Sequence, residues 1–205
     1  MPYVAIPQVV SADAEPVRDS LGGYAFLPEA IRWPVCPTSG KAMVLFFQFD
    51  VRLEFGLSVA PGSHLVVFMS PDVNEIDTID AVPSGDALPE RFWQQRLEHF
   101  KVFLFGADEV LVPSPRPDPY LVHKRLEFEL QDDPCDPFLF VGGEPRWYQD
   151  PELHPGFDFL CQLSEDYPFR KRESAPQQPD HFLRTTTGSF SVARPRVSTS
   201  GASVP

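Results

Sequence analysis

The chain has 205 residues, of which 42% are hydrophobic and 18 are phenylalanine. This is enough apolar surface for one continuous core that needs no disulfide or structural metal. Its formal net charge of −12 opposes binding to the phosphate backbone of nucleic acids. No stretch approaches the roughly 20 uncharged apolar residues of a membrane-spanning helix, so the sequence also excludes a helical membrane protein.

The N-terminal residues and the cysteines indicate the cellular compartment in which the protein resides. The first ten residues contain two prolines and no basic start, unlike a secretory signal. Cys36, Cys135 and Cys161 are an odd number of cysteines at wide spacing, which favours free thiols over a disulfide framework. We therefore expect a cytoplasmic protein, and the sequence leaves its oligomeric state open.

The first half of the chain predicts two strands and one helix. Short apolar runs over 43–49 and 64–69 are typical of buried strands. A helix is expected over 89–100, where Phe92, Trp93, Leu97 and Phe100 gather on one face with Leu88 while charged residues look outward. Such a helix would cover one face of a sheet.

The second half predicts further short strands over 101–105, 109–112, 137–141 and 157–163. Leu126, Phe128 and Leu130 alternate with two glutamates, which indicates a strand with one solvent-facing side. The 24 prolines are spread throughout and break long helices. We expect an α+β fold with few helices, built on a β-rich antiparallel or mixed sheet, as a single domain over residues 1–183.

The last residues, 184–205, are dominated by Ser, Thr, Pro, Gly and Arg and predict a disordered tail. The loss of apolar pattern is abrupt, and a shift of reading frame that removes a closing strand is an alternative interpretation. From residue 170 onward there are six basic residues against two acids, so residues 1–169 carry −16.

An internal repeat is visible in two segments, about 21–70 and 141–183. Each begins with a glycine pair and continues through an aromatic and proline segment to a glutamine in an aromatic strand. The simplest explanation is a duplication, which predicts two structurally similar halves. The motif residues, which are also our candidate binding residues, are Gly22, Gly23, Trp33, Gln48, Gly142, Gly143, Trp147, Gln149 and Gln162.

This combination of Gly-Gly, Trp-Pro, Cys-Pro and Phe-Gln with a second Gly-Gly-x-Pro-x-Trp resembles the bacterial YwqG-like family over residues 21–163. The resemblance implies a compact α+β fold with two similar halves and no established reaction. A fainter similarity extends to eukaryotic programmed-cell-death proteins that act as chaperones for a ribosomal protein. Those relatives are binders rather than enzymes.

Each motif residue has a structural and a functional interpretation. The glycines supply positive φ or close backbone approach, or else a loop that cradles a ligand. Trp33 and Trp147 fill the junction between turn and sheet, or recognise a partner. Gln48 and Gln162 bond either to the backbone of a neighbouring turn or to a ligand, because a buried amide must satisfy its donors and acceptor.

Recognisable catalytic and metal-binding patterns are missing. Cys36 opens a Cys-Pro-Thr-Ser-Gly segment that resembles a zinc knuckle with its second cysteine replaced by serine, so we expect no metal and no cofactor. The five histidines show no metal-binding spacing. Asp150, Glu152, His154 and Asp158 form the densest group of acid-base residues, either as a solvated loop or as part of an active site.

Two classes of function remain open. The first is a non-catalytic binding protein for a basic partner, such as a toxin that it neutralises or a ribosomal protein that it chaperones. The second is an enzyme with a cleft between the two halves that uses the loop from Asp150 to Asp158.

Overall fold

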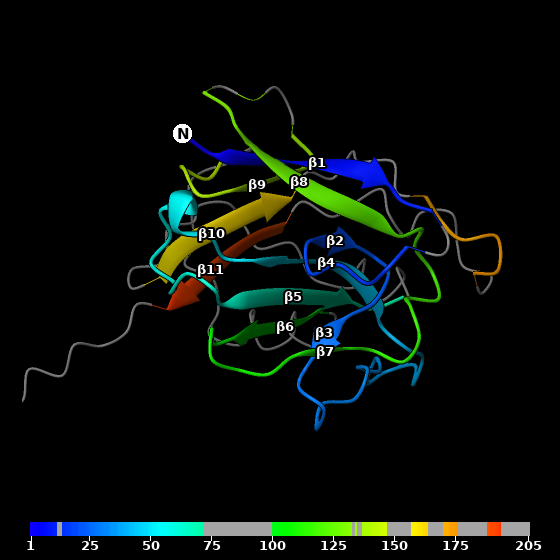
Figure 1. The fold of residues 1–205 in the computed structure, drawn as a ribbon. Helices are drawn as coiled ribbons and strands as arrows, with labels where there is room; N and C mark the ends of the chain where they lie inside the picture. Colours follow the sequence, from blue (N-terminus) through cyan, green and yellow to red (C-terminus); the bar gives the residue numbers. More distant parts are fainter. Residues whose placement is uncertain are drawn as a thin grey trace, which may run out of the picture.

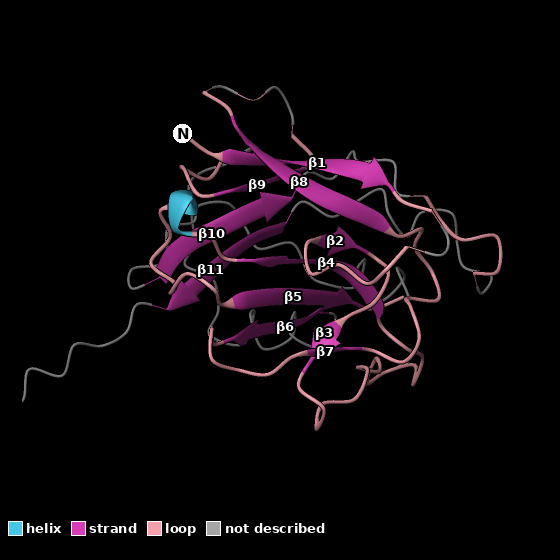
Figure 2. Ribbon diagram, viewed as in Figure 1, coloured by secondary structure: helices cyan, strands magenta, loops and turns pink. Residues whose placement is uncertain are grey.

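The computed structural model describes residues 1–11, 14–71, 100–132, 134, 137–146, 157–163, 170–175 and 188–193. Strands dominate this part of the chain (Figures 1 and 2). The strands are β1 (Tyr3–Val9), β2 (Ser20–Leu21), β3 (Phe26–Leu27), β4 (Val44–Asp50), β5 (His64–Met69), β6 (Phe100–Phe105), β7 (Val112–Pro113), β8 (Lys124–Leu130), β9 (Leu139–Val141), β10 (Phe157–Leu163) and β11 (Gly188–Ala193).

The strands form one large sheet and one small one. The large sheet has nine strands in the order β11-β10-β9-β1-β8-β2-β4-β5-β6, and each neighbouring pair is antiparallel. The small sheet pairs β3 with β7. The ladder between β1 and β8 lies within the large sheet and pairs all seven residues of each strand, from Tyr3↔Leu130 to Val9↔Lys124.

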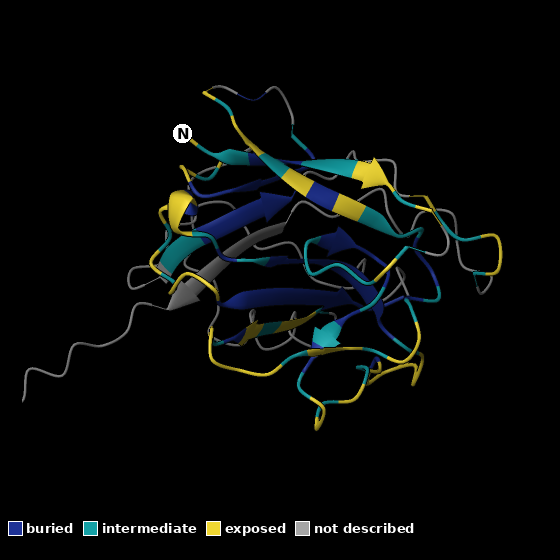
Figure 3. Cartoon of the chain, in the orientation of Figure 1, coloured by how far each residue is buried: buried dark blue, intermediate teal, exposed yellow. Residues whose placement is uncertain are grey.

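Strands β4 and β5 hold the longest runs of buried residues among the described strands, and both are dark ribbons in Figure 3. Their continuous apolar runs suit strands that are covered on both faces. Val67 and its neighbours on one face join a core cluster that also gathers side chains from β1, β2, β8, β9 and β10. Val66 and Phe68 on the other face pack in a second cluster with residues of β3 and β6.

A bulge in β4 enlarges the first cluster. The ladder between β4 and β5 shifts register between Leu45 and Phe47, which leaves Phe46 as the extra residue. Such an insertion interrupts the alternation of side chains. Phe46 and Phe47 consequently both lie in the first cluster and are fully buried.

The strand-rich, antiparallel character expected from the sequence is confirmed, and β4, β5, β6, β8, β9 and β10 lie where strands were predicted. The helix expected over 89–100 lies outside the described residues, apart from Phe100, which begins β6. Among the described residues the only helical element is a 3-10 turn, η1 (Leu53–Phe55). The α+β assignment therefore stays a prediction.

Three details of the sequence interpretation are wrong. A strand over 109–112 is replaced by a turn, in which the Glu109 N–H donates to the Gly106 carbonyl, followed by the short strand β7. Strand β1 was missed, because its Pro7 and Gln8 obscure the apolar pattern. Residues 188–193 form strand β11 on β10, although the tail was expected to be disordered.

Membrane crossing by a helix finds no support in the described residues. None of the helices there is long and apolar enough to span a bilayer.

Candidate functional site

The two glycine pairs turn the chain at the ends of two short strands. Gly22–Gly23 follows β2 with φ values of +52° and +76°, and Gly142–Gly143 follows β9 with +70° and +72°. A Cβ on Gly23 would lie 2.4 Å from the ring of His123, and one on Gly143 would lie 3.2 Å from Pro2. Positive φ and close approach both favour glycine, so the structural interpretation accounts for these residues.

Gln48 of β4 is fully buried and ties the loop after Gly23 to the sheet. Its Oε1 accepts the Phe26 N–H at 3.0 Å, and its Nε2 donates to the Tyr24 carbonyl at 2.7 Å. The same Nε2 lies 3.0 Å from Ser20 Oγ and 3.3 Å from the Val17 carbonyl. The amide is thus saturated by groups of the protein itself.

Gln162 of β10 also bonds to the loop after its glycine pair, where it accepts the equivalent N–H but donates to a carbonyl at a different position. Its Oε1 accepts the Arg146 N–H and its Nε2 donates to the Arg146 carbonyl, both at 2.7 Å. The side chain is buried, with 4% of its surface exposed. Gln162 therefore also holds a loop through the backbone of that loop.

The two motifs share three geometric features. Gln48 lies opposite Ser20 and Gln162 lies opposite Phe140, so each glutamine faces the residue two places before its glycine pair. In both motifs the N–H bonded to the glutamine belongs to the residue four places after the first glycine. Both glutamine strands also shift register two residues before the glutamine, at Phe46 and at Leu160.

The remaining motif residues have different outcomes. Trp33 donates its indole N–H to the Met43 carbonyl at 2.7 Å and meets the Phe68 ring edge-on, with centroids 5.1 Å apart. Its observed contacts are those of a side chain that fills the junction between turn and sheet. Trp147 and Gln149 lie outside the described residues.

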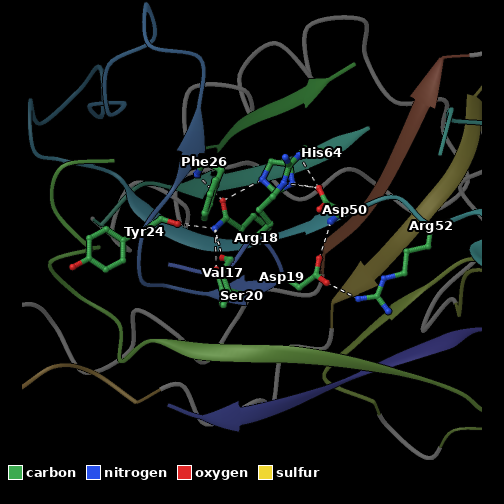
Figure 4. Close-up of polar contacts among 10 residues, drawn as sticks. Val17, Arg18, Asp19, Ser20, Tyr24, Phe26, Asp50, Arg52 and His64 are labelled. Carbon is green, nitrogen blue, oxygen red and sulfur yellow. Dashed lines mark hydrogen bonds and ion pairs between the residues drawn. The ribbon is translucent and has the colours of Figure 1, made fainter. Parts of the chain in front are cut away.

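A charged network lies beside Gln48, at the ends of β2 and β4 (Figure 4). One oxygen of the Asp50 carboxylate lies 2.8 Å from His64 Nδ1 and 2.8 Å from the Arg18 guanidinium. Asp19 accepts the Asp50 N–H at 2.8 Å and pairs with Arg52. Sequence analysis did not single out these residues, because the partners lie 14 to 33 positions apart.

The same network reaches the aromatic residues of the core. Arg52 lies over the rings of Phe55 and Phe128, at 5.6 and 5.1 Å from their centroids. The side chains of Arg18 and Arg52 are each about one-third exposed, at 36%. The network combines ion pairs with packing and fastens the end of β4 to the segment before β2.

Asp118 is a second buried polar group that the sequence analysis missed. Its carboxylate accepts the N–H groups of Leu45, Tyr120 and Leu121 at 2.6 to 2.7 Å. Burial raises the pKa of Asp118 to about 6, although these three N–H donors and Arg172 act in the opposite direction. The only local signal was its position between two prolines, because Leu45 lies 73 residues away.

Cys36 lies in a closed turn. Its N–H donates to the Lys41 carbonyl at 2.8 Å, and the Gly40 N–H returns to the Cys36 carbonyl at 2.8 Å. Burial raises the pKa of the Cys36 thiol, but hydrogen bonds from Ser39 and Ser70 outweigh it and leave the pKa below its usual value. Within the described ranges, no group of three His, Cys, Asp or Glu side chains is placed to hold a metal.

A surface depression of about 410 Å³ lies beside the second glycine pair. Asp132, Glu144 and Arg146 contribute mixed charges to its lining, together with Phe140 and the first two residues of the chain. Of the acid-base loop considered above, only Asp158 falls within the described residues, in β10 and half-buried. Asp150, Glu152 and His154 lie outside the described residues, so an active site in this loop stays a prediction.

Comparison with known proteins gives no assignment. The chain matches no protein-family model, and none of the curated proteins matches it significantly.

Proposed function

We propose that the protein is a non-catalytic binding module for a basic polypeptide, built from two similar halves of the YwqG-like type. The equivalent glutamine contacts, glycine pairs and bulges support the two halves. Gly22 and Gly142 are 120 positions apart, so the halves follow each other in the chain.

The pairing of β1 and β8 supports the same duplication. Val4 of β1 lies opposite Phe140, while Arg125 of β8 lies opposite Ser20, so β1 and β8 occupy equivalent positions beside the two glycine strands. Each is the first strand of its own half but pairs with the glycine strand of the other half. In the proposed duplication, β1 and β8 are therefore exchanged between the two halves.

This exchange fits an approximate two-fold axis. If Val4 corresponds to Arg125, then Ile6 corresponds to Glu127, and these two residues lie directly opposite each other in the β1·β8 ladder. A two-fold relation requires such a self-consistent register. The junction between the halves is then a continuous ladder of seven residue pairs rather than a cleft, which argues against the enzyme alternative.

The distribution of charge carries the functional part of the proposal. The segment 72–99, which joins the neighbouring strands β5 and β6, has seven carboxylates against two arginines and so bears −5 of the net −12. Asp108 and Glu109, just after β6, are exposed as well. Clustered carboxylates attract a basic partner and speed its association.

The resemblance described above implies two forms of such a binder. One neutralises a basic toxin, as an immunity protein or antitoxin does. The other is a chaperone or adaptor for a basic protein such as a ribosomal protein. Both need an acidic surface that releases its partner as salt is raised.

Affinity capture at low salt tests the proposal. The immobilised full chain is exposed to native cell extract and eluted with a salt step, and the eluted polypeptides are identified. The Debye length, over which charges attract each other in solution, falls from about 10 Å at 0.1 M salt to about 3 Å at 1 M salt. We therefore expect a basic partner to elute at moderate salt. Recovery of neutral or acidic partners only, or binding that does not weaken as the salt concentration is raised, would contradict the proposal.

A charge-matched pair of variants locates the acidic surface. Converting Asp72, Glu75, Asp77 and Asp80 to the corresponding amides should weaken capture. Converting Glu29, Glu127, Glu129 and Glu173 changes the net charge equally, and all four are exposed on the described framework. If the two variants weaken capture to the same extent, the carboxylates between β5 and β6 are not the ones that attract the partner.

A further inference from the structure

Strand β6 is the last strand of the large sheet among the described strands. All six of its residues pair with β5, from His64↔Phe105 to Met69↔Phe100, without a register shift. Among the described strands it has no second hydrogen-bonded neighbour. It contains no proline or bulge, although Lys101 is one of the charged side chains that natural edge strands also use to prevent pairing with another chain.

The side chains of this edge extend the core to the surface. Val102 lies opposite Val67 and Leu104 lies opposite Leu65, and both β5 residues are buried in the first core cluster. Val102 and Leu104 themselves are 41% and 38% exposed. Two neighbouring apolar side chains on one face of this edge would gain burial from an added strand.

The surroundings of the edge favour a positively charged partner. Asp108 and Glu109 are exposed three and four residues after the last residue of β6. Lys101 is the only charged residue within the strand.

We infer that β6 is the docking edge for an extended basic segment of the partner polypeptide, which adds to the sheet as a further strand. Alternate apolar residues of that segment pack on Val102 and Leu104, and flanking Lys or Arg residues meet Asp108 and Glu109 just beyond the C-terminal end of the strand. Backbone hydrogen bonds provide affinity and the side-chain alternation provides selectivity, as in other strand-addition complexes. The inference rests on the proposed function and specifies its surface.

Binding of a synthetic peptide to the full chain tests this surface. The probe is an extended peptide of alternating valine and threonine with two basic residues at each end, and its counterpart carries glutamates at those positions. We expect the basic peptide to bind more tightly, and raised salt to reduce the difference. Amide hydrogen exchange of Lys101, Val102, Phe103 and Leu104 should slow when the basic peptide is added.

Matched variants separate this edge from the rest of the surface. Val102→Arg should weaken peptide binding by about tenfold or more, because it repels the basic peptide and removes apolar contact. Val112→Arg is the control, because Val112 is equally exposed, at 42%, but lies in β7. Leu104→Arg is a second test if Val102→Arg fails to fold.

Two outcomes overturn the inference. The first is slowed exchange elsewhere in the protein while β6 is unchanged. The second is equal capture of basic polypeptides by the wild type and Val102→Arg, which leaves the proposed function intact and rejects only the edge. Peptide binding at β6 without capture of any basic polypeptide would support the edge and contradict the proposed function.

Discussion

At the scale of single residues, buried amides hold loops on the sheet. Gln48 has more protein partners than Gln162, which contacts only Arg146 among the described hydrogen bonds. Gln48→Leu should lower the free energy of unfolding by about 1 to 3 kcal/mol, since it strands buried backbone groups, and Gln162→Leu should cost less. Urea denaturation measures both; unchanged stability with lost partner binding would make Gln48 a recognition residue.

The glycine turns allow a controlled test of close approach. Gly23→Ala should destabilise the protein more than Gly40→Ala. Both positions have positive φ, but a Cβ on Gly40 meets no atom within 4 Å, whereas one on Gly23 collides with His123. Gly40→Ala should cost about 1 kcal/mol from backbone conformation alone. Equal changes in melting temperature would show that the collision with His123 is relieved at little cost.

Asp118 predicts a pH dependence of stability. Its pKa in the folded protein, about 6, lies above the ordinary value of 3.8, so between these values the folded state holds a proton that the unfolded state has released. The contribution of Asp118 to the free energy of unfolding is therefore fully present below about pH 4 and is lost as the pH rises through about 6. The stability of the wild type relative to Asp118→Asn should fall by up to about 3 kcal/mol over this window.

Denaturation of the wild type and Asp118→Asn at several pH values measures this difference. The variant is the control for all other titrating groups. If the difference grows as the pH rises, the three N–H donors outweigh burial and the carboxylate form is the preferred one.

At the scale of elements, the strands that are most buried were the easiest to predict from the sequence. Strands β4 and β5 could be predicted because burial on both faces demands a nearly continuous apolar run, which Gln48 alone interrupts among the buried residues of β4. Strand β11 could not, because only Phe190 and Val192 are large apolar residues in Gly188–Ala193, and its pairing with β10 depends on a partner more than 20 residues away. Local pattern does not encode pairing of that kind.

The candidate site divides in the same way. The glycine and glutamine motifs could be found in the sequence, since each repeats within a short window. The network of Arg18, Asp50 and His64 and the contacts of Asp118 could not, because each joins residues from separate elements. Whether Trp147 and Gln149 contribute stays a prediction.

Truncation tests the contribution of β11. A chain ending at residue 187 lacks β11 and exposes the edge of β10, whereas a chain ending at Ala193 retains the strand. We expect a lower melting temperature for the shorter chain, because β10 loses its ladder to β11. The difference between the two truncations isolates this strand, and equal melting temperatures would contradict its role in the sheet.

At the scale of the whole molecule, the N-terminal strand lies inside the large sheet. Strand β1 has β9 on one side and β8 on the other. A strand near a chain end is usually peripheral and frays. Here its loss would expose two further edges and separate the two motifs, so the proposed halves should not be stable apart.

Native-state hydrogen exchange of the intact chain tests that cooperativity. The Phe26 and Arg146 amides, bonded to Gln48 and Gln162, report on the two motifs. Because β1 and β8 pair directly between the two motifs, both amides should exchange through the same global opening and show the same free energy and denaturant dependence. Deleting residues 1–10 should abolish protection of both together, whereas ending the chain at Ala193 removes a similar length and should leave both protected. Different exchange free energies for the two amides would show that the halves unfold independently and would contradict the continuous sheet as the source of stability.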